Sequence, residues 1–90
     1  MCYRRSLIKE GAIVRHFKRE TVNPDSMNYL YKVLAVAQNT DTGEKVVVYK
    51  ALYKVVGCNV FSRNLTEFMS EVDHEKYPHI KQKYRFELCR

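Results

Sequence analysis

The stretch that decides the fold reads YLYKVLAVAQNTDTGEKVVVYKALY, at residues 29–53. β-Branched and aromatic residues dominate its two outer parts, and these residue types favour β-strands. The middle part carries Asn39, Asp41 and Gly43, which hydrogen-bond locally or accept a positive φ. The stretch therefore predicts a β-hairpin with a polar turn.

Both predicted strands of this hairpin are apolar on both faces. In the first strand Tyr31, Val33, Ala35 and Ala37 share one face, and only Lys32 interrupts the apolar character of the other. A flat antiparallel sheet with one wet face would alternate more regularly between apolar and polar residues. We therefore expect the sheet to curl over itself into a small all-β barrel.

The rest of the chain predicts shorter elements. Further strands are expected over residues 12–17, 55–61 and 84–88, which brings the total to about five. Gly57 interrupts the second of these, and residues 18–28 are expected to form the longest loop. Asn64, three residues before Glu67, has the spacing of a helix N-cap and predicts one helical turn over residues 65–69.

Length and charge set the organisation of the chain. Ninety residues suffice for one domain with a modest core. We divide the chain into a basic N-terminal segment at residues 1–10, with a short helix through Leu7 and Ile8, and a single domain at residues 11–90. The net charge is +6, and its lysines and arginines are dispersed. Such a distribution serves solubility as well as encounter with nucleic acids, nucleotides or acidic proteins.

The cysteines and the apolar runs predict a cellular location. Cys2, Cys58 and Cys89 are odd in number and widely spaced, and the first ten residues lack the apolar core of a secretory signal. The apolar runs are far shorter than the roughly 20 residues that cross a bilayer. We expect reduced thiols, a cytoplasmic protein and no association with membranes.

Several motifs recur in the order typical of a known family. They are Gly11, His16-Phe17-Lys18, Tyr31-Lys32-Val33-Leu34, Ala37, Thr42-Gly43-Glu44, Val47-Val48-Tyr49, Ala51-Leu52-Tyr53, Arg63 and Arg85-Phe86. By these motifs the chain resembles the small bacterial domain of unknown function catalogued as sixteen fifty-three, from Gly11 to Leu88. The resemblance implies an SH3-like barrel in a stand-alone cytosolic bacterial protein, and it implies no assigned activity.

The chain departs from the family pattern at two places. Arg19 stands where the family usually has glycine, and an insertion through Asn28 follows it. Asn64 follows Arg63 where the family commonly has proline. Because both changes lie beside candidate site residues, we expect them to reshape any pocket that the family shares.

One set of residues is the candidate ligand-binding site: His16, Phe17, Tyr49, Tyr53, Arg63 and Arg85. Imidazole, phenol hydroxyls and the planar guanidinium fork together suit a carboxylate, a phosphate or the edge of a base. In the alternative interpretation, Tyr49 and Tyr53 are core rings whose hydroxyls are hydrogen-bonded within the protein. Arg63 would then brace a loop against Glu44 or Glu67.

Other chemistries are less well supported by the sequence. Nucleic acid would need exposed rings for stacking, and the candidates are Tyr29, Tyr31, Tyr53, Phe61 and Tyr84. A polar stretch holds Glu71, Asp73, His74, Glu75 and His79, but its spacing matches no metal motif, so a solvated loop is favoured. No nucleophile motif or glycine-rich phosphate loop is present, and no cofactor is expected.

We therefore interpret the chain as a non-catalytic binding module for an anionic small molecule, a nucleotide or a nucleic acid. A small enzyme or enzyme subunit with a His/Tyr/Arg site is one alternative, although the sequence favours a protein that is not an enzyme. A protein–protein interaction module is the other alternative. The sequence predicts no particular oligomeric state.

Overall fold

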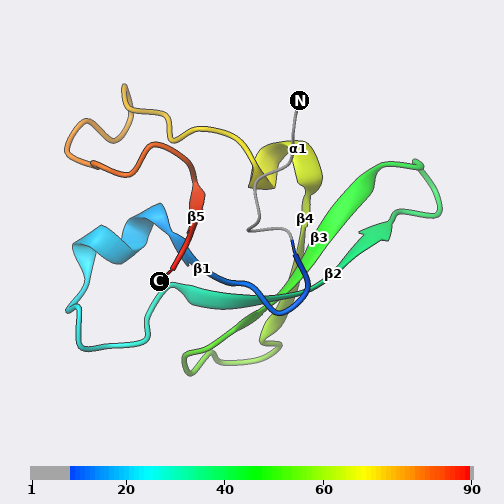
Figure 1. The fold of residues 1–90 in the computed structure, drawn as a ribbon, viewed down its shortest axis with the longest axis horizontal. Helices are drawn as coiled ribbons and strands as arrows, with labels where there is room; N and C mark the ends of the chain where they lie inside the picture. Colours follow the sequence, from blue (N-terminus) through cyan, green and yellow to red (C-terminus); the bar gives the residue numbers. More distant parts are fainter. Residues whose placement is uncertain (1–8, 90) are drawn as a thin grey trace.

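The structure, a computed structural model, describes residues 9–89. Five strands form one antiparallel sheet in the order β4-β3-β2-β1-β5 (Figure 1). The strands are β1 (Ile13–His16), β2 (Leu30–Gln38), β3 (Lys45–Ala51), β4 (Val60–Asn64) and β5 (Phe86–Leu88). A 3-10 helix, η2 (Phe17–Thr21), follows β1, and a single α-helical turn, α1 (Leu65–Phe68), follows β4. The expected β-rich fold of about five strands is confirmed.

The ends of the chain are described only in part. The predicted basic N-terminal segment lies outside the described residues except for Lys9 and Glu10, and its helix through Leu7 and Ile8 lies wholly outside them. No helix within residues 9–89 is long and apolar enough to cross a membrane.

β2 and β3 form the predicted hairpin and pair antiparallel down to the turn. The Asn39 backbone N–H donates to the Glu44 carbonyl at 2.8 Å, and the Asn39 side-chain oxygen accepts from the Asp41 N–H at 2.8 Å. Gly43 has a φ of +77°, in the left-handed region that favours glycine. The turn chemistry predicted from Asn39 and Gly43 is therefore confirmed.

A β-bulge in β2 changes which side chains face the core. The register with β3 steps between Val33 and Ala35, so Leu34 has no partner across the pair. The extra residue reverses the alternation of side chains, because residues directly opposite one another share a face of the sheet. The prediction that Val33, Ala35 and Ala37 share one face is therefore wrong beyond Leu34, and Val36 lies on the side of Val33.

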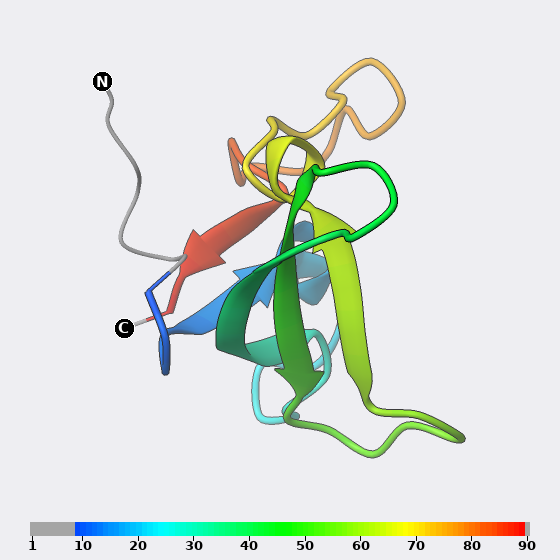
Figure 2. The same ribbon diagram turned by 90° about the vertical axis from the view of Figure 1, so that its right-hand side faces the viewer.

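The sheet is open, so the expected closure into a barrel is not confirmed. β4 and β5 are its two edges and do not pair with each other (Figure 2). α1 and the segment that follows it run between these two edges (Figure 2). The Phe68 ring of α1 stacks on the Phe86 ring of β5, with centroids 4.1 Å apart and planes 7° apart. Both rings are fully buried, at 0% and 1% exposure.

One hydrophobic core unites the sheet with α1. Its buried members are Val14, Tyr31, Val33, Val47, Tyr49, Ala51, Phe68 and Phe86. The aromatic rings dominate it, and Tyr31 packs edge-on against Tyr49 with centroids 5.2 Å apart.

The boundaries of two further elements differ from prediction. The strand expected over residues 55–61 begins only at Val60, and Gly57, with a φ of +90°, lies in the loop before it. The loop expected over residues 18–28 begins with most of η2, which was not predicted. The helical turn after Asn64 is confirmed, because the Asn64 side-chain oxygen accepts from the backbone N–H of Thr66 at 2.8 Å.

Candidate functional site

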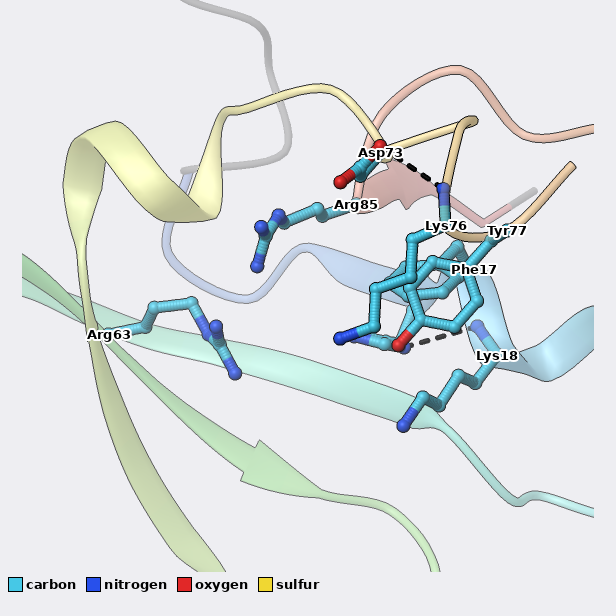
Figure 3. A pocket seen from close by; sticks show the side chains of 8 residues that line it. Phe17, Lys18, Arg63, Asp73, Lys76, Tyr77 and Arg85 are labelled. Atoms are coloured by element: carbon cyan, nitrogen blue, oxygen red, sulfur yellow. Dashed lines mark hydrogen bonds between the residues drawn. The ribbon is translucent and has the colours of Figure 1, made fainter. Parts of the chain in front are cut away.

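A pocket of about 280 Å³ opens where the end of β1, the end of β4 and the segment before β5 meet (Figure 3). It is lined by His16, Phe17, Lys18, Arg63, Asp73, Lys76, Tyr77 and Arg85. Each edge of the open sheet supplies one arginine, since Arg63 lies on β4 and Arg85 directly precedes β5. The remaining lining residues come from the β1–η2 junction and from the loop after α1.

His16 ends β1 and caps η2. Its backbone N–H donates to the Tyr29 carbonyl at 3.0 Å, and its Nδ1 accepts from the Lys18 backbone N–H at 3.1 Å. Burial, followed by the charges of Arg63, Lys18 and Arg85, lowers the pKa of His16 from 6.5 to about 4. The imidazole is therefore neutral at pH 7, and its proton lies on Nε2 because Nδ1 is an acceptor.

Arg63 is held by two aromatic residues of the core. Its Nε donates to the Tyr49 hydroxyl at 3.4 Å, and its guanidinium carbon lies 5.9 Å from the centre of the Phe86 ring. Its backbone lies opposite Val47 in the β3–β4 ladder. Backbone pairing and these two ring contacts direct the free Nη groups toward the pocket (Figure 3).

Arg85 is fixed through its backbone. Its N–H donates to the Ser70 carbonyl at 2.9 Å, and its own carbonyl accepts from the Phe17 N–H at 2.9 Å. The Nε of Arg85 is buried and has no hydrogen-bond partner among the described residues. Buried donors are nearly always paired in native proteins, and this atom departs from that pattern.

The pocket carries an excess of positive charge. Lys18, Arg63, Lys76 and Arg85 face one carboxylate, that of Asp73, which gives the lining a net charge of +3. The Asp73 carboxylate already accepts two hydrogen bonds. Its Oδ1 accepts from the backbone N–H of Glu75 at 3.1 Å and from that of Lys76 at 3.3 Å. Within residues 9–89, the one ion pair lies elsewhere and joins Arg15 to Glu87 at 3.2 Å.

The structure brings most of the predicted site residues together. His16, Phe17, Arg63 and Arg85 line the pocket, and Tyr49 lies in the core beneath Arg63. Tyr53 does not line it, because its hydroxyl lies 2.6 Å from that of Tyr31. Burial and this contact raise the pKa of Tyr31.

Two other sequence-based hypotheses concern a carboxylate partner for Arg63 and rings that could stack on nucleic acid bases. Glu44 accepts from the Asn64 side chain at 3.1 Å rather than from Arg63. None of the rings considered for base stacking lines the pocket, namely Tyr29, Tyr31, Tyr53, Phe61 and Tyr84. Tyr31 is buried in the core.

The insertion after Lys18 lies beside the pocket and is held from two directions. Its Glu20 carboxylate accepts from the backbone N–H groups of Lys81 and Gln82 at 2.9 and 2.6 Å. Arg19 donates through Nη1 to the carbonyls of Ser26 and Asn28 at 2.9 and 2.8 Å, and through Nη2 to that of Pro24 at 3.0 Å. No residue from 19 to 28 lines the pocket. The arginine that replaces the family glycine thus closes a loop beside the pocket without covering it.

Four lining residues were missing from the predicted set: Lys18, Asp73, Lys76 and Tyr77. Lys18 belongs to the His16-Phe17-Lys18 motif, which was a usable signal. The other three lie on a loop whose position depends on contacts distant in sequence, such as the 4.9 Å centroid distance between Phe17 and Tyr77.

The histidines and carboxylates of this loop form no metal site. In the part of the chain that the structure describes, no group of three or more His, Cys, Asp or Glu side chains is placed to hold a metal ion. His74 Nε2 lies 3.0 Å from the Gln82 carbonyl, within hydrogen-bond distance.

Comparison with known proteins assigns a family but no activity. No curated protein matches the chain, and no solved structure does. A family model described as "Protein of unknown function (DUF1653)" matches residues 12–88, which include every residue that lines the pocket. The chain therefore belongs to the DUF1653 family.

Proposed function

We propose that the protein is a non-catalytic module that binds a small anion in the pocket between β4 and β5. One observation carries this proposal: four cationic side chains line the pocket, and none has a carboxylate partner within residues 9–89. Like charges gathered in a partly buried space repel one another, and a bound anion relieves that repulsion.

The Arg63 side chain is also ordered before an anion arrives. It is held by the Tyr49 hydroxyl and the Phe86 ring, whereas hydrogen bonds fix the backbone of Arg85 and not its side chain. Ordering long side chains is a large part of the cost of binding, so side chains already ordered raise affinity. Guanidinium groups also match the oxygen geometry of carboxylates and phosphates better than ammonium groups do.

The state of His16 favours binding over catalysis. A general base works best with a pKa near the operating pH, whereas the pKa of His16 is lowered to about 4. Its Nδ1 already accepts from the Lys18 backbone, which leaves Nε2–H as a hydrogen-bond donor toward a ligand. In this role His16 adds a neutral donor to the cationic lining.

We also propose a setting for this function. We propose a bacterial cytoplasmic protein whose binding unit spans residues 11–90, and the free thiols of Cys58 and Cys89 fit a reducing compartment. The strand order and the helical turn before β5 support an SH3-like arrangement that is open between β4 and β5.

The test is a titration of the ¹⁵N-labelled full chain with sulfate, inorganic phosphate and succinate, followed by NMR. We expect saturable shifts of the amides of His16, Lys18 and Arg85, and an affinity that falls as salt rises from about 0.02 to about 0.2 M. Arg63→Ala and Arg85→Ala should each lower the affinity by about tenfold or more.

The matched controls are Lys50→Ala and Lys32→Ala, which also remove one cation each but lie on exposed positions outside the pocket. Melting temperatures show that each variant is folded. The proposal is wrong if no anion gives a saturable shift, or if the control variants lower the affinity as much as the arginine variants do.

A further inference from the structure

We infer that the ligand of this pocket is a phosphomonoester joined to a planar ring, the chemistry of a nucleoside monophosphate. This inference rests on the proposed function and specifies its ligand. It combines the charge of the pocket, the directions of its donors and the aromatic side chains along one of its walls.

The charge favours a dianion. The lining has a net charge of +3, and its one carboxylate already accepts two backbone hydrogen bonds within its own turn. A phosphomonoester carries about −1.5 to −2 charges at pH 7, whereas a single carboxylate carries about −1. The phosphomonoester therefore neutralises more of the repulsion among the four cations.

The donors favour a tetrahedral group. They come from β4, from the residue before β5 and from the β1–η2 junction, so they approach one space from different elements. Three terminal phosphate oxygens can accept from several directions at once, whereas a carboxylate offers two oxygens in one plane.

The rings favour a planar group next to the phosphate. Figure 3 shows Phe17 and Tyr77 on one side of the open space and the guanidinium groups of Arg63 and Arg85 on the other. Phe17 is only 5% exposed and supports Tyr77, whose ring centroid lies 4.9 Å away. The Lys76 ammonium lies 5.5 Å from the centroid of the Tyr77 ring. The planar ring of the ligand would stack on Tyr77 in place of this ammonium, and Lys76 would turn to the phosphate.

The size favours one nucleotide rather than a polymer. About 280 Å³ lies just below the roughly 300–1,000 Å³ that is common for sites of drug-sized molecules. None of the stacking candidates elsewhere in the chain lines this pocket, so no run of rings continues from it along a strand of nucleic acid.

The test compares five probes with the full chain by calorimetry: adenosine monophosphate, ribose 5-phosphate, adenosine, succinate and a single-stranded oligonucleotide. We expect adenosine monophosphate to bind at least about tenfold more tightly than ribose 5-phosphate or succinate, and adenosine to give no saturation. Tyr77→Leu should reduce the affinity for adenosine monophosphate to that for ribose 5-phosphate and leave the latter unchanged. Tyr84→Leu, which makes the same change outside the pocket, should alter neither affinity.

Each other result overturns part of this inference. Equal affinity for adenosine monophosphate and ribose 5-phosphate overturns the planar ring, and equal affinity for succinate overturns the phosphate. Tighter binding of the oligonucleotide, counted per phosphate, overturns the single nucleotide in favour of nucleic acid. If succinate binds in an Arg85-dependent manner while adenosine monophosphate binds no better, this inference fails and the proposed function stands. If no anion binds, both fail.

Discussion

Acid should destabilise the protein through His16. Burial, then Arg63, Lys18 and Arg85, lowers the pKa of this imidazole from 6.5 to about 4 in the folded chain. The unfolded chain therefore takes up a proton near pH 6.5, and the folded chain takes it up only near pH 4. Between these values the unfolded state binds more protons, so stability is highest above pH 6.5 and falls as the pH drops toward 4.

The size of this effect follows from the two pKa values of His16. At about 1.4 kcal/mol for each tenfold change in proton affinity, the difference between 6.5 and about 4 corresponds to at most about 3.5 kcal/mol. Because the ring is only partly buried, solvent screening reduces this to about 1–2 kcal/mol. That is a substantial part of the roughly 5–15 kcal/mol that stabilise a typical domain.

The assay is urea unfolding between about pH 7.5 and pH 4, for the wild-type protein and for His16→Asn. Asparagine keeps an acceptor for the Lys18 N–H but does not titrate, so the difference between the two proteins isolates the imidazole from carboxylates that titrate in the same range. His79→Gln, at an exposed position, is the control and should keep the wild-type pH dependence.

NMR titration of the imidazole gives an independent check. Added sulfate should raise the pKa of His16, because an anion offsets the field of the pocket arginines. An imidazole that titrates near pH 6.5 in the folded protein, or a His16→Asn variant with an unchanged pH dependence, would refute the reasoning.

Three further predictions concern single side chains. Phe68→Ala should lower the free energy of unfolding by about 3–5 kcal/mol in urea, since its ring is fully buried, whereas Val56→Ala, at 99% exposure, should change it by less than about 0.5 kcal/mol. Gly43→Ala should cost about 1 kcal/mol because its φ is +77°, and an unchanged melting temperature would mean that the turn is not strained by a side chain. Tyr49→Phe should keep the fold but weaken sulfate binding about two- to fivefold, because Arg63 loses a hydrogen-bond partner. An unchanged affinity in the NMR titration would remove Tyr49 from the site.

Local chemistry made the central elements predictable. Asn39, Gly43 and Asn64 form hydrogen bonds with residues only a few positions away in the sequence. The local sequence therefore suffices to predict the turn and the helix cap that they form. His16 and Arg63, two motif residues predicted to belong to the site, do line the pocket. Each lies at or near the end of a strand whose position the residue pattern predicts approximately.

Features that depend on distant contacts were missed. The bulge at Leu34 shows only in the pairing of β2 with β3, and it inverts a facing pattern that the sequence alone extends without interruption. Tyr77 reaches the pocket because its loop packs on Phe17, which no local signal near Tyr77 encodes. Tyr53 lies beyond the last residue of β3, where strand alternation no longer predicts its direction.

A ligand in the pocket would link the two open edges of the sheet. No backbone ladder joins β4 to β5, yet Arg63 stands on one and Arg85 adjoins the other. An anion bound by both arginines would act as a non-covalent cross-link between the two edge strands. This cross-link would form only when ligand is present. Fraying of either edge strand would then require release of the ligand. Amide exchange in β4 and β5 would slow together on binding, although the two strands share no hydrogen bond.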